Sequence, residues 1–371
     1  MPPSIPKKAQ TEGSATFDPD AFFESWSKEE AQPFLYQNDF RKFIIKGFGL
    51  GLRDDYPYKA TAEVTLLQAQ TYIEFGGQNG LHAWYRDAEG QARPSPTASD
   101  IAAYTDIFRP TTSTTKALKA LESNAKKDSV RMDAAKHLLS LYSPPSESSK
   151  LVVNKSKTHI NPYLEVWAWS NQNLEWGGPE ERTKDVKISH AVLPILYHHF
   201  GCVCPSYEAL SYIQQVAKGR RVLDLGSGNG YWTYVLRRVE SNSKKAVKVL
   251  PIDNGQSEWR TMWVGDTVEV DGEKWLKQNG GGKEDVLLLV YPVVGQEFTS
   301  KMLRAYAGTT IIAAGTQNVN GFTAFAKETI ADWMAREMSS WEKVLQIPLP
   351  SFAGKDEALF IFEKRPDATA S

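Results

Sequence analysis

The 371-residue chain has little cysteine and no excess of either charge. Its two cysteines, Cys202 and Cys204, are too close in sequence to cross-link distant segments, which excludes a disulfide scaffold. We therefore expect a reducing compartment, the cytoplasm or else the nucleus. Lys and Arg number 43 against 44 Asp and Glu, a formal net charge of -1. This near-neutral balance gives no electrostatic footprint for nucleic acid and disfavours it as a partner.

Long hydrophobic runs are also absent. No run approaches the roughly 18 apolar residues of a membrane span, so no membrane association is expected. Residues 1–17 are rich in Pro, Ser, Lys and Thr and lack an apolar centre, which indicates a disordered leader rather than a secretory signal. Hydrophobic residues make up 41% of the chain, an ordinary value for a globular protein. Composition leaves the oligomeric state open.

The two halves of the chain differ in pattern. Residues 18–160 carry apolar residues mostly at helical spacing. From residue 221 onward strands and helices alternate, which predicts a parallel sheet with helices on both faces. The last two strands follow each other without a helix, so the final strand is expected to insert antiparallel. The predicted fold is α/β: a Rossmann-like, doubly wound, mostly parallel seven-stranded sheet with an antiparallel last strand, plus the N-terminal helical region.

These patterns predict the following organisation: a leader at 1–17, a helical region and possible substrate cap at 18–160, a sheet domain at 161–366, and a tail at 367–371. Within the sheet domain, residues 262–264 are a candidate third strand, and 267–274 are an alternative hairpin. Residues 322–338 are expected to form one long helix.

The most informative segment runs from Arg221 to Trp232 and reads RVLDLGSGNGYW. A short apolar strand enters a glycine-rich turn, and a helix follows at once. Glycines permit tight backbone geometry and close approach of a ligand. In open α/β sheets, ligands bind beyond the carboxyl ends of the strands, and a helix start offers N–H groups there. The segment therefore predicts a cofactor loop.

The glycine spacing of this loop distinguishes between cofactors. Dinucleotide sites carry G-x-G-x-x-G, whereas this chain has G-x-G-x-G with Asp224 two residues before the first glycine. A carboxylate at that position would repel a pyrophosphate and suits a cationic ligand. The amino-acid end of S-adenosylmethionine is such a ligand, and a nicotinamide cofactor is disfavoured.

The segment VLDLGSGNGYW resembles the first motif of the class I (Rossmann-like) S-adenosylmethionine-dependent methyltransferases. The resemblance runs from about His190 to Lys364 and is greatest to an uncharacterised subgroup, whose His-His-Phe-Gly-Cys-Val-Cys-Pro wording is typical of fungal members. It implies S-adenosyl-L-methionine as the cofactor. Residues 18–160 resemble no family.

The resemblance also implies roles for individual residues. Asp224 would lie near the cofactor's amino group, Asp253 would hold the ribose hydroxyls, and Asp266 would meet the adenine amino group. For the two later acids the alternative is an ordinary turn residue. The remaining cofactor-binding candidates come from the loop itself and its helix start, namely Gly226, Ser227, Gly228, Gly230 and Tyr231.

The methyl acceptor is expected beyond the fourth strand, at Tyr291-Pro292. Amino-directed methyltransferases carry a polar residue followed by Pro-Pro-aromatic there, and the departure in this chain disfavours methylation of a base or amide nitrogen. Tyr291 either shapes the pocket or is a core tyrosine. His198 and His199 precede the first strand, and either is a candidate general base, the alternative being a packed pair.

Two other groups of polar residues have the composition of a metal site or of an acceptor contact. His198, His199, Cys202 and Cys204 lack metal-ligand spacing, so no zinc site is expected. Gln317 and Asn318 follow the fifth strand and either bond the acceptor or form a polar turn.

The sequence thus predicts a methyltransferase acting on a small molecule, with residues 18–160 as a cap. A protein or RNA methyltransferase and a non-catalytic binding protein remain alternatives, and a nicotinamide oxidoreductase is more distant. The acceptor and the atom methylated are left open.

Overall fold

The computed structural model describes residues 16–28, 32–60, 62–76, 84–239, 246–255, 259–295 and 297–366. Most of the predicted leader and the tail at 367–371 lie outside the described residues. Within the described part of the chain, no helix is long and apolar enough to cross a bilayer.

The N-terminal part is mainly helical, with one small two-stranded sheet. Its elements are α1 (Pro19–Ser27), α2 (Gln32–Tyr36), α3 (Phe40–Gly47), β1 (Tyr58–Lys59), β2 (Glu63–Val64), α4 (Leu66–Phe75), α5 (Ala98–Thr105), α6 (Thr114–Ser123) and α7 (Val130–Leu141). Three more helices lead into the main sheet: α8 (Pro162–Leu174), α9 (Val192–Phe200) and α10 (Tyr207–Ala217).

The remaining elements alternate as the sequence predicts. They are β3 (Val222–Leu225), α11 (Tyr231–Arg238), β4 (Val249–Asp253), β5 (Val268–Glu269), α12 (Gly272–Gln278), β6 (Val286–Val290), α13 (Phe298–Ala305), β7 (Thr310–Thr316), α14 (Ile330–Glu337), β8 (Trp341–Pro348) and β9 (Glu357–Lys364). Local signals set their starts. Ser206, for example, caps α10 by accepting a hydrogen bond from the Ala209 N–H at 3.2 Å.

The main sheet has seven strands in the order β5-β4-β3-β6-β7-β9-β8. The five strands from β5 to β7 in this order are parallel to one another, and β9 pairs antiparallel with both β7 and β8. The predicted Rossmann-like, doubly wound sheet with an antiparallel last strand is therefore confirmed. The chain order reverses on either side of β3, so the loop after β3 lies at a switch point, where such sheets bind ligands.

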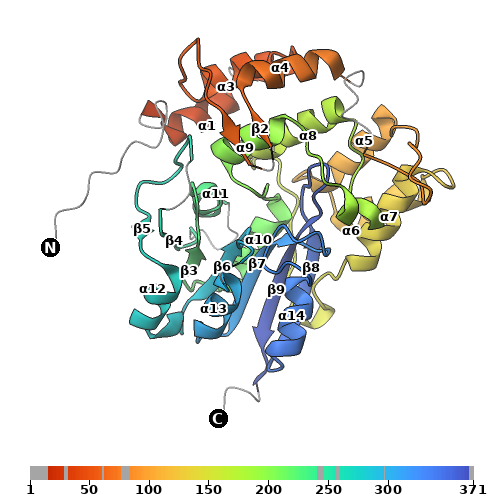
Figure 1. Ribbon diagram of the computed structural model, residues 1–371. Coiled ribbons are helices and arrows are strands. Elements are labelled where there is room, and N and C mark those ends of the chain that lie inside the picture. The colour runs from red at the N-terminus through yellow and green to blue at the C-terminus, as the bar shows by residue number, and fades with distance from the viewer. Residues whose placement is uncertain are drawn as a thin grey trace.

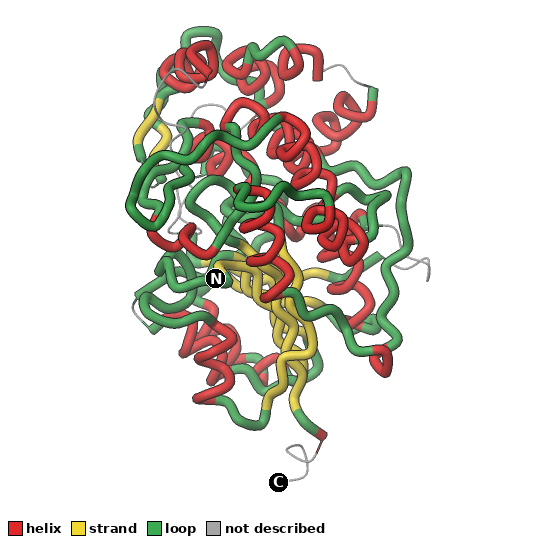
Figure 2. The backbone as a smooth tube through the Cα atoms, turned by 90° about the vertical axis from the view of Figure 1, so that its right-hand side faces the viewer, coloured by secondary structure: helices red, strands yellow, loops and turns green. Residues whose placement is uncertain are grey.

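Helices cover both faces of the sheet (Figures 1 and 2). On one face, Leu223, Leu287 and Ile311 pack against residues of α12, α13 and α14. On the other, Val222, Leu288 and their neighbours join a core that continues through α8–α11 into the N-terminal helices. The N-terminal part thus shares its core with one face of the sheet. It lies over the edge at which the parallel strands end (Figure 1).

A buried ion pair joins the two parts of the chain. Arg260 is 2% exposed and holds Asp54 through two hydrogen bonds of 2.6 and 2.7 Å. The Arg260 guanidinium also lies over the Tyr56 ring at 4.3 Å. Because breaking a buried pair leaves a charge without compensation, this contact fixes the N-terminal part against the sheet domain.

Two of the predicted elements are wrong. The third strand is β5 at Val268–Glu269, not 262–264, and the alternative hairpin is absent because Asp271 caps helix α12 by accepting from the Lys274 N–H at 2.9 Å. The helix expected over 322–338 is confined to α14, Ile330–Glu337, and it begins at the Thr329 cap. Before that cap the chain forms turns that cover the end of the sheet.

Candidate active site

The cofactor loop connects β3 to α11 with three glycines in the left-handed region. The φ angles of Gly226, Gly228 and Gly230 are 74°, 56° and 80°. Gly226 is exposed, and Ser227 and Gly228 are half-buried, so ligands can approach the first half of the loop. Asn229 and Gly230 are buried beneath it.

The loop N–H groups are bonded within the protein. Those of Gly226 and Ser227 both donate to the Ile252 carbonyl, at 2.7 and 3.1 Å. The Gly228 N–H donates to the Asp253 carboxylate at 3.0 Å, and the Gly230 N–H donates to the Ser227 carbonyl at 2.9 Å. A phosphate needs such N–H groups as donors. The N–H groups of Gly226, Ser227, Gly228 and Gly230 are already committed, so the loop has few donors to offer a phosphate.

Oxygen acceptors in the same place remain available. Asp224 is fully buried, and its Oδ2 accepts from the Thr233 hydroxyl at 2.6 Å, while its Oδ1 has no hydrogen-bond partner among the described residues. Burial raises the pKa of Asp224 to about 7, against the lowering effect of the Thr233 hydrogen bond. The Ser227 hydroxyl is likewise buried without a partner. A site rich in acceptors and poor in donors suits a cation.

Asp253 ends β4 beside the loop. Its Oδ2 accepts from Gly228 and its Oδ1 accepts from the Gly255 N–H at 2.8 Å, which is the turn expected of an Asp before Asn-Gly. Each carboxylate oxygen has two lone-pair sites, so both retain capacity for a ribose hydroxyl. The structural role and the predicted binding role are therefore compatible.

Two aromatic rings that the sequence analysis missed flank the loop. A Cβ added at Gly226 would lie 3.6 Å from Phe298, and one at Gly228 would lie 2.8 Å from the Trp259 indole. The rings come from α13 and from the segment after β4. No local pattern marks them, because each is a single aromatic residue in a turn or at a helix start.

The second half of the loop is structural. A Cβ added at Gly230 would lie 2.3 Å from Val264, so this glycine is required for packing. Tyr231 points away from the loop: its ring is 1% exposed, and its hydroxyl donates to Asn161 at 2.7 Å. The predicted cofactor contact from Tyr231 is corrected, because its side chain belongs to the core.

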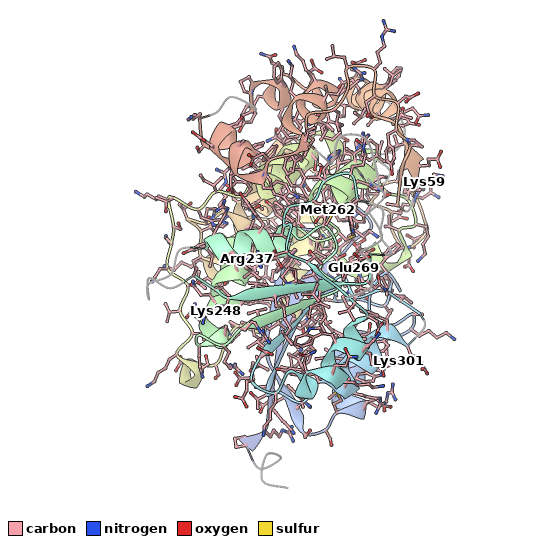
Figure 3. All side chains as sticks on the ribbon, turned by 90° about the vertical axis from the view of Figure 1, so that its left-hand side faces the viewer. Lys59, Arg237, Lys248, Met262, Glu269 and Lys301 are labelled. Atoms are coloured by element: carbon pink, nitrogen blue, oxygen red, sulfur yellow. The ribbon has the colours of Figure 1, made fainter. Side chains whose placement is uncertain are left out.

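Asp266 lies further along, in a bidentate ion pair with Arg237 of α11. The two hydrogen bonds measure 3.0 and 2.8 Å, and they are the first cause of the lowered pKa of Asp266. Arg237 lies alongside β4 and also donates to the Val249 carbonyl at 2.8 Å (Figure 3). Both Asp266 oxygens thus face an arginine, and the predicted adenine contact has no support in this geometry.

The predicted histidine base is also corrected. His199 is fully buried, with Nε2 bonded to the Tyr58 hydroxyl at 2.9 Å and Nδ1 to the Thr261 hydroxyl at 2.7 Å. Burial holds the pKa of His199 well below its usual range. His198 is 8% exposed and bonds the Lys59 carbonyl at 2.8 Å through Nε2. Both rings are packed by residues of the N-terminal part, which the sequence could not place.

Tyr291 follows β6 directly and has an unusual backbone. Its φ angle is 50°, in the left-handed region that a bulky residue rarely adopts. Its N–H donates to the Ala314 carbonyl at 2.7 Å, and its ring meets Tyr197 edge-to-face at 5.9 Å. Strain of this kind costs about 1–3 kcal/mol and collects at functional sites. Tyr291 thus has a strained backbone at the end of β6, and its role in binding an acceptor stays a prediction.

The amide pair after β7 has a supporting role. Gln317 donates to the buried Asp356 carboxylate at 2.8 Å, and Asn318 donates to it at 3.0 Å. His137 of α7 lies 2.6 Å from the same carboxylate, whose hydrogen bond raises the pKa of His137 against the effect of burial. These contacts hold the end of the β8–β9 loop in place.

The residues on either side of Asp356 were not predicted as site residues. Lys355 and Glu357 are 2% and 3% exposed, and the side-chain polar atoms of both lack hydrogen-bond partners among the described residues. Lys355 Nζ lies 3.3 Å from the centre of the Phe322 ring and 5.9 Å from that of Tyr291. Their sequence, a charged run in a loop, is that of a solvated turn, and only the fold buries it. No group of three His, Cys, Asp or Glu side chains in the described ranges is arranged to hold a metal.

Comparison with known proteins gives fold neighbours alone. No protein-family model and no curated protein matches the chain. Among solved structures, magnesium protoporphyrin IX methyltransferase from Synechocystis PCC 6803 with bound SAM aligns at 11% identity and a TM-score of 0.30, covering 73% of this chain and 100% of the other. The trans-methyltransferase CalH in complex with SAH aligns at 12% identity and 0.33, covering 92% of each. The CMeT domain of the citrinin polyketide synthase aligns at 14% identity and 0.28, covering 96% and 100%. Because these TM-scores are low, the interpretation of the site rests on the chain's own sheet topology and glycine loop.

Proposed function

We propose that the chain is an S-adenosylmethionine-dependent methyltransferase. One observation carries the proposal: the glycine loop at the sheet's switch point has bonded four of its five N–H groups internally and presents acceptors instead. Asp224 Oδ1 and the Ser227 hydroxyl lack partners, and Gly226 beside them is exposed. An ammonium has three donors and no acceptor, so it complements this loop, whereas a pyrophosphate does not.

The remaining contacts fit the rest of that cofactor. Asp253 at the tip of β4 has lone pairs for the ribose hydroxyls, and Trp259 and Phe298 flank the loop with rings against which a purine packs. Once bound, the cofactor supplies an electrophilic methyl group with its leaving group already in place. The protein's task is then to bind, to orient the acceptor and to exclude water.

The acceptor we propose is a small molecule. The N-terminal helices lie over the edge where the loop opens (Figure 1), and they share a core with the sheet rather than forming a separate module. A cap held by the buried Arg260–Asp54 pair leaves room for a small acceptor more readily than for a folded protein or an RNA.

Calorimetry tests the cofactor assignment. Titration of the whole protein with S-adenosylmethionine is expected to give saturable heat, and titration with NAD to give none. Heat from NAD alone, or from neither ligand up to millimolar concentration, would overturn the assignment. Labelled donor incubated with host extract then identifies the acceptor. Loss of the labelled product after protease or RNase treatment of the extract would contradict the small-molecule acceptor.

The role of Asp266 gives a separate prediction. Because Asp266 is 59% exposed at its side chain and faces Arg237, Asp266→Asn is expected to cost less than about 1 kcal/mol of folding stability. S-adenosylmethionine affinity should stay within about threefold of wild type, as measured by calorimetry. A loss of affinity above tenfold would restore the adenine contact for Asp266.

A further inference from the structure

A cluster of buried polar side chains lies at the same edge of the sheet as the cofactor loop. Its members are Tyr197, Cys202, Tyr291, Lys355 and Glu357, which are close enough to shift one another's pKa values through space. The Lys355 ammonium and both Glu357 carboxylate oxygens make no hydrogen bond with any described residue or with each other. Burying charges in this way costs free energy unless a ligand compensates them.

The cluster lies on the same face of the sheet as Asp224, at the edge where the cofactor loop lies. Glu357 begins β9 and pairs with Thr316 at the end of β7, while Tyr291 follows β6, the strand next to β3. Side chains alternate along strands, so Glu357 shares a face with Leu359, just as Asp224 shares a face with Val222. From β3 to β9 is three strand positions, roughly 14 Å at about 4.8 Å per strand. A methyl donor the size of a nucleoside, together with an acceptor that carries an aromatic ring, would span such a distance.

The backbone around the two charges is held rigidly. Asp356 between them accepts hydrogen bonds from Gln317 and Asn318, and the Glu357 N–H donates to the Ser351 hydroxyl at 2.8 Å. Lys355 donates its N–H to the Phe352 carbonyl at 2.8 Å. The charged groups are therefore positioned in advance, as binding and catalysis require.

We infer that this cluster of buried polar side chains binds the methyl acceptor, that the acceptor is a small phenol, and that Glu357 is its general base with Lys355 as the partner of the phenolate oxygen. The inference rests on the proposed function for the origin of the methyl group. The Phe322 and Tyr291 rings line the approach to Lys355 and fit a planar ring.

The acidity of the acceptor hydroxyl favours a phenol over an aliphatic alcohol as the acceptor. Burial is the main cause that raises the pKa of Glu357 and lowers the pKa of Lys355, with Asp356 raising the former further. A base tuned toward neutrality removes protons efficiently from a group of similar acidity, and a phenol with a pKa of about 10 is far closer than an alkyl alcohol.

The proposed reaction moves one proton and one methyl group. The Glu357 carboxylate accepts the phenolic proton while Lys355 stabilises the negative oxygen. A lone pair of that oxygen forms the bond to the methyl carbon, and the electron pair of the breaking sulfur–carbon bond stays on sulfur. Glu357 then releases its proton to solvent. The products are the aryl methyl ether and a neutral thioether.

The test uses 4-nitrophenol, whose absorption distinguishes the phenol from the phenolate, without any methyl donor. At mildly acidic pH, where the ligand in solution is neutral, wild-type protein is expected to bind it with the phenolate spectrum and to bind nitrobenzene at least tenfold more weakly. Lys355→Met should weaken 4-nitrophenol binding at least tenfold. Glu357→Gln should keep the phenolate spectrum, which depends on Lys355, but it should remove the loss of 4-nitrophenol affinity that ionisation of Glu357 causes in wild type as pH rises through about 8. Glu363→Gln, an exposed position on the same strand, is the matched control and should behave as wild type.

Each outcome has a distinct meaning. If wild type binds nitrobenzene as well as 4-nitrophenol, or if both variants match wild type, the assignment of this cluster as a phenol site is refuted. S-adenosylmethionine calorimetry on the same variants should match wild type, so failure of the cofactor assignment is recognised separately. If a single variant does not fold, Lys355→Met with Glu357→Leu replaces it. This pair removes both buried charges, and it is expected to raise Tm and to lose 4-nitrophenol binding. A lower Tm than wild type would mean that the two charges serve the fold.

Discussion

Asp224→Asn is expected to weaken S-adenosylmethionine binding by roughly 30- to 1000-fold, about 2–4 kcal/mol, while the protein stays folded. The amide is nearly the same size and can keep the bond from Thr233, but it lacks the charge that attracts an ammonium. Asp224 is fully buried with Oδ1 unpartnered, so little solvent screens that charge. The effect should therefore greatly exceed that of an exposed acid such as Asp266.

The same carboxylate should make stability depend on pH in an unusual direction. Its folded pKa of about 7 lies above the ordinary 3.8, so the folded state holds the proton more tightly than the unfolded state. The stability contributed is fully present below pH 3.8 and is lost as pH rises through about 7. Over that window the loss is on the order of 4 kcal/mol. Asp224→Asn removes the titration, so it should gain stability relative to wild type from pH 5 to pH 8.

Calorimetry and urea unfolding check both effects. Because the cofactor's ammonium favours ionised Asp224, binding should release a proton, and the heat should differ between buffers of different ionisation enthalpy. The variant should show neither the proton release nor the pH trend in unfolding. Asp266→Asn serves as the control, since its carboxylate is already ionised beside Arg237. Wild-type affinity in Asp224→Asn would show that this acid only braces the loop through Thr233.

Gly230→Ala is expected to have the second large effect, which is a loss of folding stability. The added Cβ would lie 2.3 Å from Val264 Cγ2, and the φ angle of 80° is strained for alanine. Overpacking costs typically 1–3 kcal/mol and left-handed backbone about 1–2 kcal/mol, so a loss of about 2–5 kcal/mol is expected. At an unfolding entropy of about 2.1 cal/mol/K per residue, 371 residues give roughly 1.3 °C per kcal/mol, so Tm should fall by roughly 3–6 °C.

Gly280→Ala separates the two contributions. Gly280 has a φ angle of 62°, and nothing lies within 4 Å of its added Cβ, so only backbone strain applies. The difference between the two variants in thermal or urea unfolding measures the Val264 contact alone. Equal Tm values would mean that the 259–264 segment moves aside without cost. A side chain at Gly228 would likewise meet a neighbouring side chain, because an added Cβ would lie 2.8 Å from the Trp259 indole.

The predictions that held depend on local signals. The strand, turn and helix around the cofactor loop follow from an apolar run, three glycines with positive φ and a helix start, all within a dozen residues. The antiparallel last strand follows from the missing helix between β8 and β9. Boundaries failed where a cap overrode periodicity, as Asp271 and Thr329 did. A single side chain can start a helix where the hydrophobic pattern alone suggests none.

The sequence by itself determined the sheet, its cofactor loop and the acid before the first glycine, because backbone conformation and hydrophobic period are properties of neighbouring residues. Only the tertiary structure decided which polar side chains are available. His199 is enclosed by Tyr58 and Thr261, and Asp266 is held by Arg237, while Lys355 and Glu357 are buried with no hydrogen-bond partner for their charged groups among the described residues. Burial, charge compensation and the resulting pKa values arise from segments far apart in the chain, which no local pattern records.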